Sequence, residues 1–515
     1  MQVNATTSFS RMKVVADADG LTSRAGSALL TRLADVVGLT DGLVSALSVH
    51  SRTVRHEPGR VARDLAVMLA DGGDCLTDLG ALRDQSVLFG EVASDATAYR
   101  CVERLDEETL SRLRGARAAA RARAWALARG AQRLILDIDA TLVTAHSDKE
   151  GAAGTYKGGF GFHPLLCFEA TTGEALSAIL RPGNAASNTA ADHVAVLVAA
   201  LAQLPQGAAS PGTLVRCDSG GATHAFLAAV SARELAFSVG FDLTERVRAA
   251  ILALPESAWL PALDSGGDPR DGAWVAELPL DLSAWPEGTR AICRRERPHP
   301  GAQLSFTDSG GHRFQVLLTN QQGTRIARLE QVHRQRAAIE DAIRCAKASG
   351  LRNLPFRSYA MNAAWLELVL IGCDLLAWTR RLLLSGTELG ACEPKRLRYR
   401  LLHVAGRIAR HAGGVRLRLP RSWPWAQTLV AAFARLQALP LRLTSGRPPR
   451  ETQVLTGRLQ HALKGTGVTA GHLSRRRRAA AAPPAVLARR RYRGTGPDAV
   501  LRGGRDTLRE RSRLG

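Results

Sequence analysis

Apolar residues recur at three- and four-residue spacing along the first quarter of the chain. The segments ARDLAVMLAD and EETLSRLRGARAAARARAWALARG show this helical period, which runs from about Ser27 to Gly130. We therefore predict an all-helical N-terminal domain over residues 1–130. Short polar turns precede helix starts in DCLTDLGALRDQ and ASDATAYRCVERL, an arrangement typical of a helix-turn-helix DNA reader. A helical bundle or a dimer arm explains the same pattern equally well.

After Gln132 the pattern changes to short apolar runs rich in Ile, Leu and Val. RLILDIDATLV, HPLLCFEATTG and EALSAILRPG are typical of strands, AADHVAVLVAALAQL is helical, and TLVRCDSGG is again a strand. The order strand, strand, strand, helix, strand is that of an RNase H-like core. We therefore predict an α/β fold, with this core formed by residues 131–243 and 321–390.

Strand-like pieces with Pro- and Gly-rich connections interrupt this core. GAWVAELPL, RAICRRE and QLSFTDSGGHRFQVLLT predict a mainly β insertion over residues 244–320. Helical patterns resume in RIARLEQVHRQRAAIEDAIRCAKAS and NAAWLELVLIGCDLLAWTRRLLL. Residues 391–445 are expected to form a basic helical C-terminal region, and residues 446–515 a disordered basic tail.

Charge favours a polyanionic partner. The chain has 69 Lys and Arg against 47 Asp and Glu, a formal net charge of +22, which is typical of proteins that bind nucleic acid. Only six of these cations are lysines, so the arginine excess also fits a GC-rich coding sequence. The segment from Ser474 to Gly515 holds 13 Arg against three acids. The cluster KRLRYR at 395–400, with Arg407 and Arg410, indicates a DNA-facing surface.

Cysteine usage and hydropathy bear on the compartment. The eight cysteines form no CxxC pair and no cluster at zinc spacing, which favours a reduced, intracellular protein. The N-terminus lacks the pattern of a signal peptide. The most apolar stretch, Ala363–Trp378, is interrupted by Glu367 and Asp374, so we predict no membrane span.

Acidic residues at strand ends are the candidate chemistry. Asp137 and Asp139 share one face of an apolar strand, and Asp218 follows the strand TLVRC. Carboxylates that converge in this way could hold divalent ions for in-line phosphoryl transfer, because Mg²⁺ prefers hard oxygen ligands. The DSGG string of Asp218 recurs at Asp264 and Asp308, but those two copies lie in a loop and at a hairpin tip and are interpreted as turn formers.

A third acid lies in the helical segment HRQRAAIEDAIRCAK. At about 100° per residue, His333, Arg336, Glu340 and Lys347 fall within roughly a 60° stripe, whereas Asp341 points about 100° away from Glu340. The outer face of any surface helix carries charges, and that explanation accounts for each of these residues singly. A single acid flanked by two cations on one stripe fits it less well.

The spacing of this stripe resembles the Tyr, Arg, Glu, Lys signature of a group of DDE insertion-sequence transposases, with His333 in place of the tyrosine. LDIDAT, YKGGFGFHPLLCFEATTGEAL, RCDSGGA and LRDQSVLFGEVASDATAYR together resemble the thirteen-eighty insertion-sequence family of that group, from roughly Ser27 to Pro440. The resemblance implies Asp139, followed by Thr141, as the first catalytic acid, with Asp137 as the alternative.

The same resemblance implies the rest of a DNA transposition machinery. Asp218 and Glu340 would complete a site for two Mg²⁺ ions, with Mn²⁺ able to substitute. Arg336, Lys347 and His333 are the expected phosphate contacts. Lys157, which precedes two glycines, is a further candidate, although a tight turn between strands explains this segment at least equally well. The expected partners are DNA with terminal inverted repeats and target DNA, bound by a dimer or higher assembly at the nucleoid, in the bacterial cytoplasm.

Two other functions remain open from the sequence. An RNase H-like endonuclease that cuts without strand transfer would need the same acids, and a transposase-derived DNA-binding protein could have lost activity. Three tryptophans of the insertion, Trp259, Trp274 and Trp285, could stack on an unpaired base, although core packing explains them better.

Overall fold

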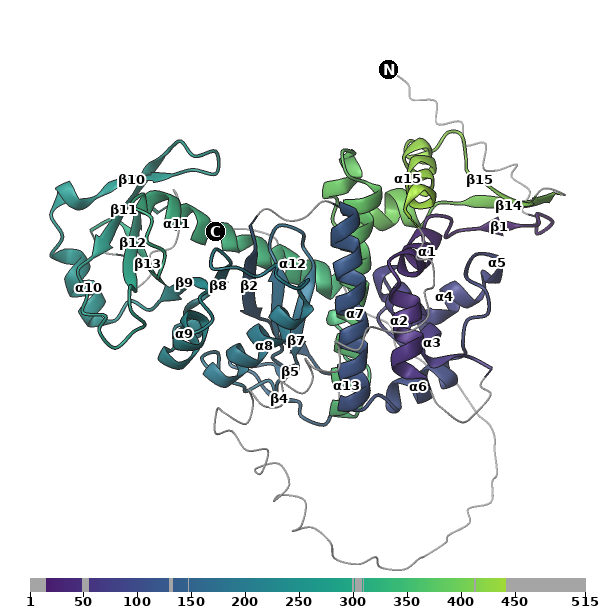
Figure 1. The fold of residues 1–515 in the computed structure, drawn as a ribbon, viewed down its shortest axis with the longest axis horizontal. Coiled ribbons are helices and arrows are strands. Elements are labelled where there is room, and N and C mark those ends of the chain that lie inside the picture. Colours follow the sequence, from purple (N-terminus) through teal and green to yellow (C-terminus); the bar gives the residue numbers. More distant parts are fainter. Residues whose placement is uncertain are drawn as a thin grey trace, which may run out of the picture. The chain divides into compact units, whose positions relative to one another are not determined.

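The computed structural model describes residues 15–48, 55–128, 133–146, 148–298, 301, 308, 310–411 and 414–440 (Figure 1). The expected tail, residues 446–515, lies outside this part of the chain. Helices and one large mixed sheet dominate the described residues, so the expectation of a mixed α/β protein is confirmed.

Helices follow one another from residue 28 to residue 128. They are α1 (Ala28–Val36), α2 (Leu39–Leu47), α3 (Pro58–Ala70), the 3₁₀ turn η2 (Leu76–Leu79), α4 (Gly80–Arg83), α5 (Ser86–Phe89), α6 (Asp95–Glu103) and α7 (Glu107–Ala128). Helix α3 begins with Pro58 after Glu57, whose carboxylate accepts a hydrogen bond from Arg60 N at 2.9 Å. Nearly all of its side chains are buried, which places α3 at the centre of the helical layer.

Two features tie this helical stretch to the rest of the chain. The short strand β1 (Leu21–Thr22) pairs with β14 (Gly406–His411), and α3 packs against α13 (Tyr359–Trp378). The apolar period could not indicate either contact, because both partners lie far along the sequence. The helices therefore share their hydrophobic core with the C-terminal half.

The large sheet has nine strands in the order β10-β11-β12-β13-β9-β8-β2-β6-β7. Strands β2, β8 and β9 are parallel, and the other pairs are antiparallel. The bounds are β2 (Ile135–Ala140), β6 (Leu165–Glu169), β7 (Ala175–Ile179), β8 (Leu214–Cys217), β9 (Ala236–Phe241), β10 (Leu260–Leu263), β11 (Pro269–Leu278), β12 (Arg290–Glu296) and β13 (Arg313–Thr319). A small second sheet of β3 (Val143–Thr144), β5 (Phe160–Phe162) and β4 (Ala153–Gly154) follows β2.

Helices cover both faces of the core strands. Alternate residues of β2 enter two different cores: Leu136 and Ile138 pack with α8 (Ala190–Gln203) and α9 (His224–Ser231), whereas Asp137 faces α12 (Ala338–Ala346). Strand β6 alternates in the same way, which is the expected period of a strand buried on both sides. The two aspartates of β2 therefore lie on the α12 face.

The segment predicted as a mainly β insertion, residues 244–320, adds its strands to the main sheet. After α10 (Glu245–Leu252), strands β10 to β13 extend the sheet outward from β9. The junction is fixed at Thr319 and Asn320, which end β13: Thr319 Oγ1 donates to Phe237 O at 2.7 Å, and Asn320 Oδ1 accepts from Phe237 N at 2.8 Å. Helix α11 (Ile326–Arg334) then packs on β10 and β11.

The C-terminal part of the described chain is less helical than expected. Residues 391–440 include a β hairpin, which pairs with β1 and completes a three-stranded sheet. After α13 the chain continues through the π turn η7 (Thr379–Leu383) and the 3₁₀ turn η8 (Glu388–Ala391). The elements that follow are α14 (Pro394–Leu397), η9 (Arg398–Leu402), β14, β15 (Gly414–Arg418) and α15 (Ala426–Ala438). A basic sequence of alternating character, RIARH followed by VRLR, forms these strands.

The apolar stretch Tyr359–Leu383, which comprises α13 and the following π turn, is long and apolar enough to cross a membrane by length and composition. In the structure 89% of its most apolar window is buried within the protein, as in the core helix of a folded domain. Asp374 on this helix accepts hydrogen bonds from Arg117 Nε at 2.7 Å, from Arg121 Nη2 and from Ala175 N at 3.1 Å. This buried network joins α7, α13 and β7.

Candidate active site

Asp139 and Asp218 lie side by side at one edge of the sheet. Strands β2 and β8 are parallel, with Asp137 opposite Arg216, so the same register two residues on brings Asp139 level with Asp218. Neighbouring strands lie about 4.8 Å apart. The carboxyl ends of parallel strands are where α/β proteins commonly bind ligands, so the location suits a functional site.

The turn after β8 leaves Asp218 open to solvent. Its Oδ1 accepts from Gly220 N at 3.1 Å and caps the short 3₁₀ turn η3 (Ser219–Gly221). A Cβ on Gly221 would lie 2.6 Å from Cys217 Cβ, and one on Gly240 of β9 would lie 2.9 Å from Ser219 N. Glycine is required at both positions because the turn folds tightly against its own strand and β9.

Glu340 reaches the same site from the first turn of α12. It is exposed, and its charge, together with that of Asp218, raises the pKa of Asp139. Burial is the larger cause, and Arg336 opposes it; the result is a pKa of about 6 for Asp139. Three acids that the sequence separates widely therefore act on one another electrostatically.

Arg336 supplies the positive charge of this cluster. Arg336 lies in the 3₁₀ turn η5 (Gln335–Ala337), and its Nη2 is 3.1 Å from Asp139 Oδ1. The Nε and Nη2 atoms of Arg336 are buried and have no hydrogen-bond partner among the described residues. The guanidinium thus balances Asp139 by charge rather than by an aligned hydrogen bond.

Asp137, the alternative first acid, is engaged elsewhere. Arg216 Nε lies 2.6 Å from Asp137 Oδ1, and Arg216 Nη2 lies 2.7 Å from Oδ2. Both side chains are buried, and Arg216 also donates to Val332 O. A forked pair of this kind occupies both carboxylate oxygens, so a metal ion could bind Asp137 only by displacing a buried arginine.

The acids fit a divalent ion by their chemistry. Three carboxylates offer the hard oxygen ligands that Mg²⁺ prefers. Among the described residues, one group of three potential metal ligands has all its ligand atoms within 4.8 Å of one another: Asp74, Cys75 and Asp78. Asp139, Asp218 and Glu340 are not as close together as that. That other group is explained by capping, because Asp78 Oδ2 accepts from Asp74 N and Cys75 N.

The stripe of four residues does not lie on one continuous helix. Helix α11 ends at Arg334, η5 follows, and α12 passes into the π turn η6 (Lys347–Leu351). His333 lies partly buried with Nδ1 2.9 Å from Ser238 Oγ, and burial, followed by Arg336 and Arg216, lowers its pKa to about 3. It is therefore neutral and faces β9, which suits phosphate contact poorly.

The two expected phosphate-binding lysines lie near each other. Lys347 Nζ donates to Leu142 O at 2.9 Å, just after β2. Burial lowers the pKa of Lys347, and the charge of Lys157 lowers it further. Lys157 lies exposed in the turn that Thr155 and Gly159 close by a 2.8 Å backbone hydrogen bond. Both cations are thus near the end of the strand that carries Asp139.

Two histidines near Asp218 were not found by sequence reasoning. His163 and His193 are buried, and the charge of Asp218 acts on both; burial is the main cause of their lowered pKa values. Their Nδ1 atoms lie 3.1 Å from Ala185 O and 3.0 Å from Thr189 O. A lone histidine in an apolar segment gives no such signal, although His163 directly precedes the proline that leads into β6.

The DSGG string at Asp264 lies in a loop, in agreement with its interpretation as a turn former. The Oδ1 of Asp264 accepts from the backbone N of Gly266, Gly267 and Asp268, which defines a loop former. Asp308 forms an ion pair with Arg313 at 3.3 Å, and the serine after it lies outside the described residues.

The insertion tryptophans have packing partners. Arg295 lies over the rings of Trp259 and Trp274, at 4.4 and 5.0 Å from their centroids. Trp285 stacks on His224 at 4.0 Å between centroids. These contacts support the packing interpretation for Trp259 and Trp274.

Two aspartates thus lie at the ends of parallel strands of the mixed sheet, and a glutamate lies on the first turn of a helix that covers it. The chain belongs to the family described as transposase DDE domain group 1, whose model matches residues 6–441. The comparison with curated proteins finds no match. Among solved structures, the chain is similar to a piggyBac transposase in a synaptic complex with hairpin DNA, at 10% identity, 84% coverage of each chain and a TM-score of 0.40.

Proposed function

We propose that this protein is a DNA transposase that cleaves DNA at terminal inverted repeats and joins the freed ends to target DNA. The observation that carries the proposal is the meeting of Asp139, Asp218 and Glu340 at the carboxyl edge of the sheet. Membership of the DDE family adds the expectation of a divalent metal. We further propose that β2, β6, β7, α8 and β8 form an RNase H-like core and that the chain is of the thirteen-eighty insertion-sequence type.

The three acids would hold two Mg²⁺ ions, or Mn²⁺ in their place. Such ions, when bound, activate the attacking oxygen and stabilise the leaving one. Asp139 would accept an ion once Arg336 releases its oxygen, and Arg336 would then be free to contact the phosphate beside it. Lys347 and Lys157 supply further positive charge at the end of β2, where the scissile strand would lie. We also propose assembly as a dimer or larger complex on DNA, at the bacterial nucleoid.

Cleavage of DNA that carries the element's own ends tests the site. With Mg²⁺ present, Glu340→Gln is expected to abolish cleavage, because an amide cannot replace the charged oxygen. Asp341→Asn is the matched control. Asp341 is the next residue on α12, but its side chain is 75% exposed and pairs with Arg344. The Asp341→Asn variant should therefore cleave DNA as well as the wild type does. Equal cleavage by wild type and Glu340→Gln would refute the assignment.

Two other functions would give different results in the same assay. A nuclease would cleave the ends in a Glu340-dependent manner but would never join them to target DNA. An inactive DNA-binding descendant would bind the ends and leave them uncut in both proteins.

A further inference from the structure

An open groove lined by three arginines lies away from the three acids. Its volume is about 910 Å³, and it is bounded by the β6–β7 turn on one side and by the end of α13 with the following turns on the other. None of the described residues that line it is acidic. The lining residues that carry the argument are Arg133, Arg380, Arg381, Thr171 and Thr172.

The groove is at the opposite end of β2 from the catalytic edge. Ile135, the first residue of β2, lines it, whereas Asp139 lies four residues further on. At about 3.3 Å per residue, the two positions are separated by about 13 Å along the strand. The groove is therefore a separate feature of the surface.

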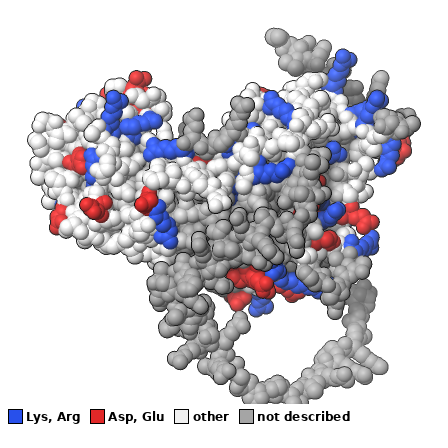
Figure 2. All heavy atoms as spheres, in the orientation of Figure 1, with Lys and Arg blue, Asp and Glu red and all other residues white. Residues whose placement is uncertain are grey.

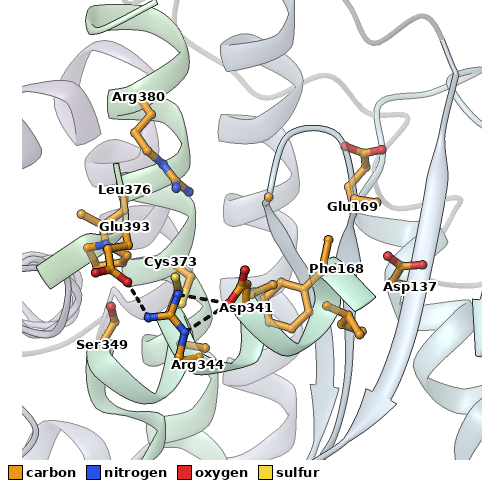
Figure 3. A pocket seen from close by; sticks show the side chains of 18 of the residues that line it. Asp137, Phe168, Glu169, Asp341, Arg344, Ser349, Cys373, Leu376, Arg380 and Glu393 are labelled. Carbon is orange, nitrogen blue, oxygen red and sulfur yellow. Dashed lines mark hydrogen bonds and ion pairs between the residues drawn. The ribbon is translucent and has the colours of Figure 1, made fainter. Parts of the chain in front are cut away.

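Arg380 lacks a compensating charge. No carboxylate within ion-pair or hydrogen-bond distance is recorded for it among the described residues, and Figure 3 shows it clear of the ion pairs that Arg344 makes with Glu393 and Asp341. Burial lowers its pKa, and the groups that oppose this are the thiols of three cysteines. Its guanidinium lies against the turn at Gly173, where a Cβ would be 3.5 Å from Nη2.

Arg381 is compensated only in part. Its Nη1 lies 3.9 Å from Glu174 Oε2 and has no hydrogen-bond partner within the part of the chain that the structure describes. Glu174 is fully buried and also accepts from the indoles of Trp125 and Trp378. Because that carboxylate is shared among several donors, the groove retains positive charge. A desolvated guanidinium without a partner is costly, and a bound anion would remove the cost.

The surplus of charge at this groove is not simply that of the whole chain. Residues 441–515 carry 18 Lys and Arg against four Asp and Glu, so most of the +22 excess lies outside the described part. On the face drawn in Figure 2, both Lys and Arg and Asp and Glu side chains are scattered over the described surface. Three arginines without an acid in one groove are therefore a local feature.

We propose that this groove binds the phosphodiester backbone of DNA, as a second contact surface in addition to the catalytic edge. An open, polar groove suits an extended polyanion, whereas small-molecule sites are enclosed and mostly apolar. Arg380 and Arg381 belong to η7, and Arg133, whose Nη2 donates to Gln321 Oε1 at 3.0 Å, precedes β2, so that a strand in the groove would meet cations from two segments of the chain. The inference rests on the proposed action on DNA.

The salt dependence of DNA binding tests the groove. Binding of the full chain to a labelled duplex is measured by fluorescence anisotropy at several salt concentrations, without divalent metal, for an end sequence and for an unrelated duplex. Each phosphate contact contributes about 0.9 to the slope of log K against log salt. Arg380→Gln should reduce the slope by about 0.9 on both duplexes, and Arg133→Gln/Arg380→Gln by about twice that.

Arg233→Gln is the matched control, because it removes the same charge from an exposed arginine whose recorded contact is with Ala229 O in its own helical turn. Its slope should equal that of the wild type. Unchanged slopes in both groove variants, or the same decrease in Arg233→Gln, would overturn the proposal. Arg380→Gln should unfold at a midpoint no lower than that of the wild type, since no ion pair is lost; a lower midpoint would contradict the premise that Arg380 is uncompensated.

Inorganic phosphate separates a free anion from a DNA backbone. If phosphate raises the melting temperature of the wild type but not of Arg380→Gln, while both have the same DNA slope, the groove binds a small anion and the DNA assignment is wrong. The anisotropy assay measures binding alone, so the two proposals can fail separately. If the wild type never cleaves DNA but the groove variants have a smaller salt slope, the transposase proposal is refuted and the groove proposal is supported. If the wild type cleaves DNA normally but the groove variants keep the salt slope of the wild type, the groove proposal is refuted and the transposase proposal is supported.

Discussion

Asp139→Asn is expected to stabilise the metal-free protein. The pKa of Asp139 is raised from its usual 3.8 to about 6, chiefly by burial, with Asp218 and Glu340 adding to the rise and Arg336 opposing it. A raised pKa means that the fold favours the neutral carboxyl. The resulting stability is fully present below about pH 4 and is lost as the pH rises through about 6.

The size of the effect follows from the shift. One pKa unit corresponds to about 1.36 kcal/mol, so a shift of about two units costs the charged form about 3 kcal/mol at pH 7.5. Asparagine cannot be charged and avoids this cost. The advantage of Asp139→Asn should therefore be about 3 kcal/mol at pH 7.5 and about half of that at pH 5, where the wild-type carboxyl is largely protonated in the folded state.

Urea denaturation at these two pH values, with EDTA present, measures the difference. Saturating Mg²⁺ should stabilise only the wild type and so reduce the difference in free energy of unfolding between the two proteins at pH 7.5. Asp137→Ala is the opposite-sign control on the same strand: it leaves the buried Arg216 unpaired and should cost about 3–5 kcal/mol. A variant Asp139→Asn that is no more stable than wild type at pH 7.5, or an advantage that does not shrink at pH 5, would refute the reasoning.

Two further predictions concern stability. Asp374→Ala removes the nearer carboxylate of two buried arginines of α7, Arg117 and Arg121, and leaves them Glu367 at 3.8 Å and Glu174 at 3.4 Å. It should lower the free energy of unfolding by about 3–5 kcal/mol in urea; a loss below about 1 kcal/mol would contradict the network. Gly350→Ala forces a side chain onto a φ of +103° with its Cβ 2.3 Å from Leu69 Cδ2, so thermal unfolding should show a loss of at least about 1–3 kcal/mol. Gly154→Ala, where a Cβ meets nothing within 4 Å, should be tolerated, and equal losses in both would argue against this account.

Local pattern was sufficient for much of the candidate site. Asp218 was recognisable because an apolar strand precedes it, and Glu340 because of its spacing from Arg336 and Lys347. The alternation of β2 correctly placed Asp137 and Asp139 on one face. These inferences use interactions within a few residues, which a sequence records directly.

The rest depends on contacts between distant segments. That Asp137 is held by Arg216 follows only from the register of β2 against β8. The continuation of the main sheet through β13 depends on Thr319 and Asn320 meeting Phe237. No periodicity distinguishes a strand that extends an existing sheet from one that forms a new sheet.

The pairing of β1 with β14 bears on how the molecule is made. Leu21 pairs with Arg407, which lies hundreds of residues further along the chain. The helical layer likewise waits for α13, against which α3 packs. Native contacts of such long sequence separation form slowly, so the helical layer is completed only after both α13 and the β14–β15 hairpin are available. A chain cut short before Gly406 would lack the strand that pairs with β1, and one cut short before Tyr359 would leave the buried face of α3 without the helix that covers it.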